Sequence, residues 1–241
     1  MSKQRERPIL FSGAMVRAIL EGRKKMTRRV VKHRIYSNGF HFDGRDILCH
    51  CDELPPSAML MEVKRGKIAY TTSNLEGWES ECPYGAPGDR LWVREAWARD
   101  FEMSSRVFYR ADADEDGTIP YLVAGEGMGG GVGNARIDRW RPSIHMPRWA
   151  SRITLEVTGV RVERVQDISE EDAIAEGVER RVIGSGWREY GLDDATELAG
   201  TPPLATARES FRSLWDSINA KRAPWASNPY VWVVAFRRVQ S

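Results

Sequence analysis

Apolar and polar residues alternate with a period of two in several segments of the chain, which is typical of β-strands. The longest such segment covers residues 150–165, where Ile153, Leu155 and Val157 lie on one side and polar residues lie on the other. Shorter segments of this kind predict strands at residues 8–12, 91–93, 106–112 and 228–239, and residues 66–72 predict one arm of a hairpin. Strands are therefore expected along the whole chain.

Three segments show instead the spacing of amphipathic helices, at residues 14–22, 169–177 and 205–220. The first ends at Gly22, a residue type suited to a helix C-terminus. The second begins at Ser169, whose hydroxyl can cap a helix N-terminus, and acidic residues follow in its first turn. The apolar stripes contain Met15, Ile19 and Leu20 in the first helix, and Phe211, Leu214, Trp215 and Ile218 in the third.

Three long segments between these elements, at about residues 33–81, 112–150 and 178–203, are predicted to be insertions. The turn before the strand predicted at residues 91–93 contains Asp89, whose carboxylate can accept hydrogen bonds from the backbone of the turn. Residues 124–134 contain six glycines and predict a loop that packs no core. Because strands dominate and no glycine-rich phosphate fingerprint is present, we predict one α+β domain over residues 1–241. It is expected to be a partly open β-barrel with flanking helices rather than a doubly wound parallel sheet.

Bulk composition excludes several classes of protein. A formal net charge of +2 is too small for a dense cationic surface that binds nucleic acid by charge alone. Arginine outnumbers lysine 29 to 7, so the adjacent Lys24 and Lys25 stand out. No segment approaches the roughly 18 apolar residues of a membrane span, and the N-terminus lacks the apolar core of a signal peptide. We expect a cytoplasmic protein.

The cysteines do not predict a disulfide framework. Cys49, Cys51 and Cys82 are an odd number of thiols in a compartment expected to be reducing. Together with His41 and His50 they are residue types that bind zinc. Their spacing lacks the paired Cys-x-x-Cys arrangement of structural zinc sites. We predict no metal and no other cofactor, with a structural zinc site as the alternative.

Four segments resemble the ASCH family of the PUA-like superfamily in order and spacing, namely residues 22–29 (GRKKMTRR), 87–95 (PGDRLWVRE), 153–165 (ITLEVTGVRVERV) and 168–177 (ISEEDAIAEG). Short bacterial members include N4-acetylcytidine amidohydrolases, whose signature matches Gly22, Arg23, Lys24, Thr27 and Arg29. The family's acidic residue, late in the helix after the long strand, matches Glu176. The resemblance implies a catalytic Lys24, Thr27 and Glu176 that hydrolyse a linear amide on a cytosine base. The chain departs from the pattern at Lys25, where threonine is common, and its length is similar to that of versions carried by phages and prophages.

The residue types fit this chemistry. A threonine hydroxyl is a poor nucleophile at neutral pH and needs an adjacent base to take its proton. Lys24 can be that base only when neutral, which burial or nearby cations such as Arg28 and Arg29 favour by lowering its pKa. In this interpretation Thr27 attacks the acyl carbonyl, while Glu176 orients the lysine and passes a proton to the leaving amine. A water nucleophile that Thr27 only positions is the alternative.

Tryptophans and arginines are interleaved in residues 139–149, a combination suited to unpaired nucleic acid or a free nucleoside. We assign substrate binding to Arg23, Arg29, Trp140, Arg148 and Trp149. The expected partner is a modified nucleoside or single-stranded RNA, and no membrane. The alternative for the tryptophans is that they only cap the barrel. The alternative functions are a non-catalytic module that binds RNA or a modified base, and a ribonuclease of the same fold.

Overall fold

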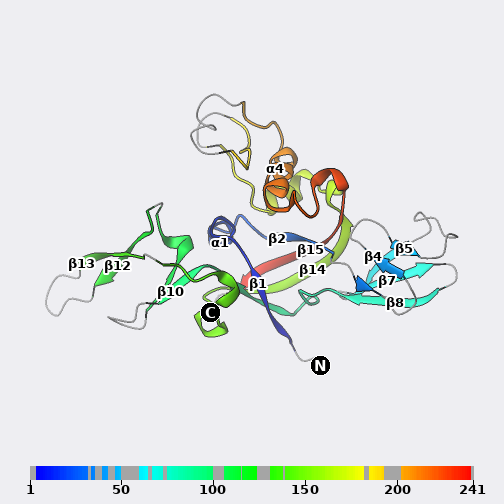
Figure 1. Ribbon diagram of the computed structural model, residues 1–241, viewed down its shortest axis with the longest axis horizontal. Helices are drawn as coiled ribbons and strands as arrows, with labels where there is room; N and C mark the ends of the chain where they lie inside the picture. Colours follow the sequence, from blue (N-terminus) through cyan, green and yellow to red (C-terminus); the bar gives the residue numbers. More distant parts are fainter. Residues whose placement is uncertain are drawn as a thin grey trace.

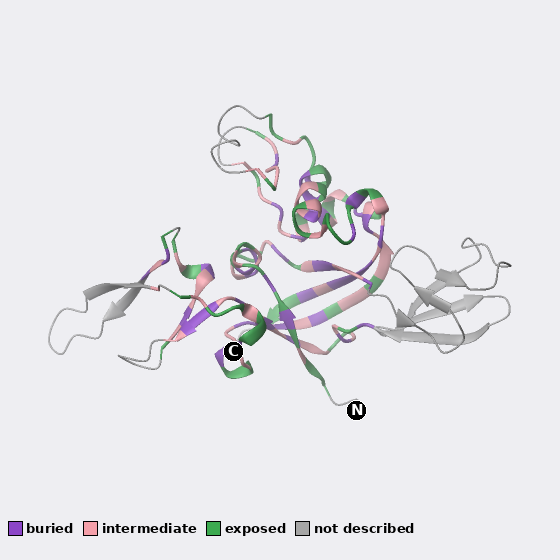
Figure 2. Ribbon diagram, in the orientation of Figure 1, coloured by how far each residue is buried: buried purple, intermediate pink, exposed green. Residues whose placement is uncertain are grey.

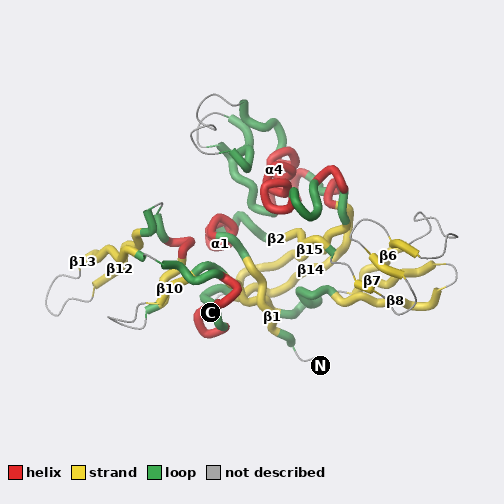
Figure 3. Tube along the Cα trace, viewed as in Figure 1, coloured by secondary structure: helices red, strands yellow, loops and turns green. Residues whose placement is uncertain are grey.

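The residues described by the computed structural model are 4–31, 34–35, 40–42, 47–49, 60–64, 67–72, 75–99, 106–114, 116–123, 131–137, 139–181, 185–192 and 202–239. Within residues 34–81 and 120–136 the description covers the backbone of strands and not their side chains. Figure 3 shows the helices, strands and loops of these residues along the Cα trace. Strands dominate, as the alternating sequence patterns predict.

A five-stranded mixed sheet forms the centre of the fold, in the order β1-β9-β14-β15-β2 (Figure 1). Its strands are β1 (Glu6–Leu10), β2 (Met26–Val30), β9 (Arg90–Arg94), β14 (Thr154–Arg164) and β15 (Tyr230–Val239). The pair β1 and β9 is parallel, whereas the other neighbours are antiparallel. The edge strands β1 and β2 do not pair with each other, so the described strands form an open sheet. The predicted α+β class is confirmed.

Each face of the central sheet carries its own hydrophobic core, because side chains alternate across a strand. On one face Trp232, Val234 and Phe236 of β15 pack with helix α1 (Gly13–Leu20). On the other face Val231 and Val233 pack with helix α4 (Ala207–Asn219). Figure 2 shows buried residues concentrated along these strands and helices. Helices therefore cover parts of both faces.

Helix α2 (Glu170–Ala175) is bound to α4 through its first residue. The Glu170 carboxylate accepts the backbone N–H groups of Ala207 and Arg208 at the N-terminus of α4. An anion at this position also complements the positive end of the α4 dipole. The predicted N-cap of α2 is confirmed, because the Ser169 hydroxyl accepts the N–H of Asp172. The two helices thus form one layer over the sheet.

The remaining strands form small sheets outside the central one. These are β3 (Arg34–Ile35), β4 (Phe40–Phe42) and β5 (Ile47–Cys49); β6 (Leu60–Lys64), β7 (Lys67–Thr72) and β8 (Leu75–Glu81); β10 (Trp97–Arg99) with β11 (Val107–Tyr109); and β12 (Thr118–Val123) with β13 (Gly131–Arg136). The short 3-10 helices are η2 (Arg110–Asp112), η3 (Ser143–His145), η4 (Arg148–Ala150), η5 (Val165–Asp167) and η6 (Trp225–Ser227). In the part of the chain that the structure describes, no helix has the length and apolar character needed to cross a membrane.

The predicted loop at residues 124–134 is wrong in part. Residues Gly131–Arg136 form β13, which pairs antiparallel with β12, while residues 124–130 lie outside the described residues. Pairing needs only backbone N–H and C=O groups, so glycines weaken a strand without preventing it. The predicted first strand is confirmed with a shift of two residues, since β1 ends at Leu10 and the Ser12 side chain caps α1.

Gly177→Ala is expected to destabilise the protein by about 2–4 kcal/mol. Gly177 has a φ of +87°, and a Cβ atom there would meet Lys24 Cβ at 3.0 Å and Ala18 Cβ at 3.2 Å. Gly22→Ala is the matched control, because its φ is +76° but an added Cβ meets nothing within 4 Å. Only the backbone penalty of about 1–2 kcal/mol applies there. Urea unfolding measures both free energies, and equal losses would contradict the close-packing argument.

Candidate active site

The turn between α1 and β2 holds the backbone of Lys24 in place. The Lys24 N–H donates to the Ala18 carbonyl of α1 at 2.9 Å, and the Lys25 N–H donates to the Ala175 carbonyl of α2 at 2.8 Å. The Lys25 carbonyl accepts the N–H of Phe236 in β15. Two helices and a central strand, distant from one another in sequence, therefore fix this turn.

Lys24 and Glu176 form a buried ion pair. Their side chains are 1% and 4% exposed, and Lys24 Nζ lies 2.7 Å from Glu176 Oε2. The same amine donates to the backbone carbonyl of Glu176, also at 2.7 Å. Glu176 is the residue that caps the C-terminus of α2. One lysine thus binds both the side chain and the end of the helix, and the structure brings these two predicted residues together.

Arg28 binds the other oxygen of Glu176. Its Nη1 donates to Glu176 Oε1 at 3.2 Å, and its Nη2 donates to Asp172 at 2.6 Å and to Glu163 at 2.5 Å. The Arg28 side chain is completely buried. Two cations therefore balance the buried carboxylate of Glu176, one at each oxygen, and the network continues to acidic residues of α2 and β14.

Burial changes the pKa of Lys24. Removal from water lowers the pKa because it penalises the ammonium form, the Glu176 carboxylate raises it in part, and Arg29 and Arg28 lower it again. The net result is a pKa below the usual value of a lysine. The neutral amine, which is the form a general base requires, is thus available at a lower pH than in free lysine.

Strand β2 directs Thr27 and Arg29 toward α1, and Arg28 toward the opposite face. The Arg29 guanidinium lies 5.3 Å from the centre of the Phe11 ring, whereas that of Arg28 lies 5.7 Å from the ring of Phe211 in α4. Thr27 is buried, with 3% exposure. Its hydroxyl has no hydrogen-bond partner among the described residues. Among these residues, the Thr27 hydroxyl is therefore not used in a structural hydrogen bond.

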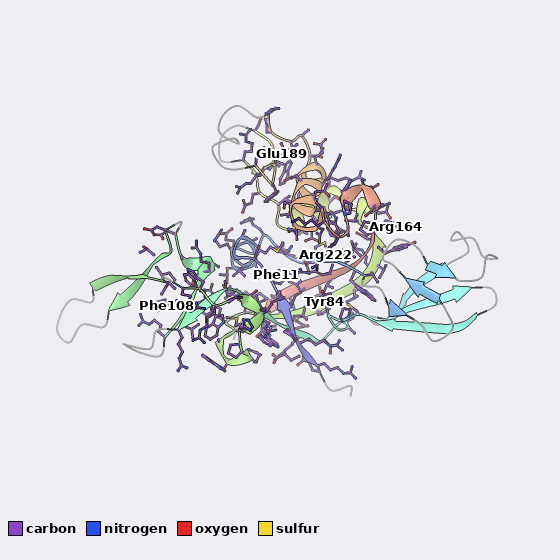
Figure 4. All side chains as sticks on the ribbon, viewed as in Figure 1. Phe11, Tyr84, Phe108, Arg164, Glu189 and Arg222 are labelled. Atoms are coloured by element: carbon purple, nitrogen blue, oxygen red, sulfur yellow. The ribbon has the colours of Figure 1, made fainter. Side chains whose placement is uncertain are left out.

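A cavity of about 480 Å³ lies beside this cluster, between the start of the chain and α4. Much of its wall is apolar and includes Leu10, Phe11, Met15, Leu214 and Ile218. The polar part of the wall consists of Ser12, Arg29, Ser143, Glu176, Glu179, Tyr190 and Ser217. Figure 4 labels Phe11, one of these wall residues, beside α1. The volume lies in the range of small-molecule sites.

Glu176 lines the cavity, whereas Lys24 and Thr27 do not. Lys24 lies behind Glu176, bonded to its carboxylate. Arg29, two residues from Thr27 on the same face of β2, does line the cavity. Its Nη2 donates to the Leu10 carbonyl, while its buried Nε has no hydrogen-bond partner among the described residues. The wall therefore offers the carboxylate of Glu176 and the guanidinium of Arg29.

Arg23 faces a different cavity. Its Nε donates to Glu21 at 2.6 Å and its Nη1 donates to the Gly177 carbonyl at 3.2 Å. It lines a second cavity of about 810 Å³ together with Lys25 and Trp187. Glu179, in the segment after α2, lines both cavities, so this segment lies between them. Arg23 thus supports the end of α2 instead of lining the cavity beside Glu176.

The three predicted binding residues between positions 139 and 149 also do not line the cavity at Glu176. Arg148 is bonded to Glu6 through Nε and Nη2. Trp140 lies under the guanidinium of Arg110, 5.7 Å from its ring centre. Trp149 is 60% exposed. The structure therefore places Arg148 and Trp149 on the surface around η4, whereas Trp140 is half-buried against the cluster of Ala98, Phe108 and Ile119.

A second buried acid escaped the sequence analysis. Glu95 follows β9, is 1% exposed, and accepts from Arg152 at both oxygens, at 3.0 and 3.1 Å. Burial raises the pKa of Glu95, and Arg152 lowers it in part. Arg152 also pairs with Asp112 at 2.6 Å. A lone glutamate after an alternating strand carries no sequence signal of burial, so only the tertiary contacts reveal it.

Tyr190 and Glu179 were also missed as parts of the cavity wall. The Tyr190 hydroxyl accepts the N–H of Glu179 at 2.9 Å. Burial raises the pKa of Tyr190 to about 12. Both residues belong to the predicted insertion at residues 178–203, whose sequence shows neither helical nor strand periodicity. The sequence patterns therefore could not identify these two residues as part of the cavity wall.

Within the described residues there is no group of three or more side chains that could hold a metal ion. Cys82 is buried, and burial raises the pKa of its thiol to about 11. A thiol with such a pKa is protonated at neutral pH and is a poor metal ligand. The side chains of His41, His50, Cys49 and Cys51 lie outside the described residues, so the alternative of a zinc site there stays a prediction.

Loss of the two members of the ion pair is expected to have unequal effects on stability. Glu176→Leu leaves Lys24 and Arg28 buried without their common anion, which costs about 3–5 kcal/mol. Lys24→Met removes a buried charge while Glu176 keeps its bond to Arg28, so the expected cost is only about 1–2 kcal/mol. Urea unfolding at neutral pH measures both variants. A larger loss for Lys24→Met would contradict the role given to Arg28.

No family model, curated protein or solved structure matches the chain. The resemblance to the ASCH family therefore rests on the residues of the four segments named above. Independently of that resemblance, the structure brings Lys24 into contact with Glu176, 152 residues further along the chain. The function of this cluster has to be argued from its geometry and chemistry.

Proposed function

We propose that the chain is a hydrolase of the ASCH type that removes an acyl group from the N4 amine of a modified cytosine nucleoside, such as N4-acetylcytidine. The observation that carries this proposal is the buried pair of Lys24 and Glu176, 2.7 Å apart, in which Glu176 lines a cavity and Lys24 lies behind it. Burying two charges is costly, and perturbed groups of this kind cluster at functional sites. In the same proposal the open central sheet belongs to a PUA-like, partly open barrel.

The cavity suits a nucleoside. Its volume of about 480 Å³ exceeds what a bare acyl group needs and is of the size that encloses a small ligand. The apolar walls of Met15 and Leu214 are suited to the flat faces of a pyrimidine ring. The Arg29 guanidinium in the cavity wall is suited to an acyl or base carbonyl oxygen. These features favour a planar, partly polar substrate.

In the proposed reaction Lys24 acts as a general base in its neutral form. It takes a proton from the nucleophile, which is the Thr27 hydroxyl or a water molecule beside it, during attack on the acyl carbonyl. The tetrahedral intermediate then collapses, the bond between the acyl carbon and N4 breaks, and the proton returns from the lysine ammonium through Glu176 to the leaving amine. Water as the nucleophile yields the free acid directly, whereas Thr27 first forms an ester that water hydrolyses.

The other charged residues position and stabilise these groups. Arg28 holds Oε1 of Glu176, which directs Oε2 toward Lys24. The carboxylate then stabilises the ammonium that forms when Lys24 accepts the proton. Arg29 is suited to hold the oxyanion that develops on the acyl carbonyl. In this scheme Arg28 acts through Glu176 and does not contact the substrate.

A second function, a non-catalytic module that binds RNA or a modified base, is favoured by one observation. Lys24 and Thr27 do not form part of the cavity wall. Their contacts would then serve to link α2 to β2, and the cavity would hold a base without turnover. Hydrolysis assays with matched variants distinguish the two functions.

Lys24→Met and Glu176→Gln are each expected to lower kcat/KM for release of cytidine from N4-acetylcytidine by about 100-fold or more, the usual contribution of a general base. Thr27→Val should cause a similar loss if Thr27 is the nucleophile and a loss of about 10-fold if it only positions water. Lys25→Met, which changes the exposed neighbouring lysine, is the control and should keep the wild-type rate. Full activity in all three variants would overturn the assignment of these residues, whereas no hydrolysis by the wild-type chain would favour the binding module.

The pH profile provides a separate test of Lys24 as the base. Since the neutral form is active, kcat/KM should rise with pH through the lowered pKa of Lys24, below the usual value of about 10.4. Arg29 is one of the cations that lower this pKa, so Arg29→Gln should move the rising limb to higher pH. Arg29→Lys keeps the charge and should leave the limb in place. A shift to lower pH in Arg29→Gln would argue against Lys24.

A further inference from the structure

Trp149 is an exposed aromatic ring held by buried neighbours. It is 60% exposed, the largest value among the exposed large apolar side chains of the described residues. Its ring forms a T-shaped pair with that of Trp97, which is 3% exposed, with ring centroids 5.8 Å apart and an interplanar angle of 88°. The guanidinium of Arg99 lies 5.3 Å from the centre of the Trp149 ring. The Trp149 ring is therefore held by two neighbouring side chains, while more than half of the residue stays open to solvent.

The sequence around this ring is positively charged. Residues 139–149 contain three arginines and one histidine but no aspartate or glutamate. Arg139 and Arg141 are exposed, and the Arg141 guanidinium lies 5.1 Å from the centre of the Trp97 ring. Arg148 forms an ion pair with Glu6. We refer to residues 139–149 together with Arg99 as the Trp149 strip.

The Trp149 strip is continuous with the cavity at Glu176. Ser143, in the middle of the strip, is part of the cavity wall. Ile144 follows it and is 55% exposed, and the wall residues Leu10 and Ile218 are themselves 40% and 55% exposed. Six residue steps separate Ser143 from Trp149, so the two are at most about 20 Å apart. A chain of a few nucleotides covers such a distance.

We propose that the Trp149 strip binds the flank of a single-stranded nucleic acid whose target base enters the cavity at Glu176. This inference rests on the proposed function and specifies its substrate as a polymer instead of a free nucleoside. Aromatic rings stack on unpaired bases of any sequence, and arginines contact the phosphates between them. The positive charge favours a polyanion over an apolar protein partner as the occupant. A base must also be unpaired to enter a cavity, which excludes an intact duplex.

The test is binding of an unmodified, fluorescein-labelled oligouridine of about 12 nucleotides, a length typical of such sites. Fluorescence anisotropy gives the Kd of the full chain and its variants at one fixed salt concentration. Trp149→Ala should weaken binding about 10-fold or more, because it removes a stacking surface. Trp149→Phe retains an aromatic face and should stay within about 3-fold of the wild type.

Ile174→Ala is the matched control, since Ile174 is 47% exposed and lies on α2, outside the strip. It should bind as the wild type does. Absence of binding by the wild-type chain, unchanged binding by Trp149→Ala, or an equal loss in Ile174→Ala would overturn the proposal. The oligonucleotide carries no acyl group and the readout is binding alone. A failure here is therefore distinguishable from a failure of nucleoside hydrolysis, which the Lys24 and Glu176 variants report.

Discussion

The carboxylate of Glu176 is the point on which this arrangement depends. It ends α2, it is buried, and each of its oxygens is bound by a different cation, Lys24 from the turn after α1 and Arg28 from β2. A buried charge without a partner would cost several kcal/mol, so neither Lys24 nor Glu176 is stable in this position alone. The helix, the turn and the strand are consequently required to come together as one unit.

The position of β2 at the edge of the sheet explains how one carboxylate can connect two cores. Arg28 points toward α4 and Arg29 points toward α1, because neighbouring residues of a strand face opposite sides. In a central strand the sheet would separate the two sides, but past an edge strand a helix end can contact both. Glu176, at the end of α2, occupies this position past the edge of β2. The cavity beside it is formed where α1 and α4 approach the same edge.

Local patterns predicted the elements that carry the site but not the full set of contacts. Strand β14 and the Ser169 cap of α2 depend on neighbouring residues, so alternation and residue type were sufficient. The pairing of Lys24 with Glu176 was expected from the family resemblance and not from spacing. The bond of Arg28 to Glu176 was not expected, since alternation alone separates Arg28 from Thr27. The cavity walls come from segments with no local relation, so only the assembled fold reveals them.

The hydrogen bonds of Lys24 bear on its protonation state. A neutral amine has two N–H groups and one lone pair, whereas an ammonium has three N–H groups. Lys24 donates to two acceptors, both on Glu176, and has no third acceptor among the described residues. Both N–H groups of the neutral form are thus used, while the charge of the ammonium form is also stabilised by the Phe11 ring, whose centre lies 5.9 Å from Nζ. Burial, which lowers the pKa of Lys24, and the Glu176 carboxylate, which raises it in part, therefore act in opposite directions on one amine.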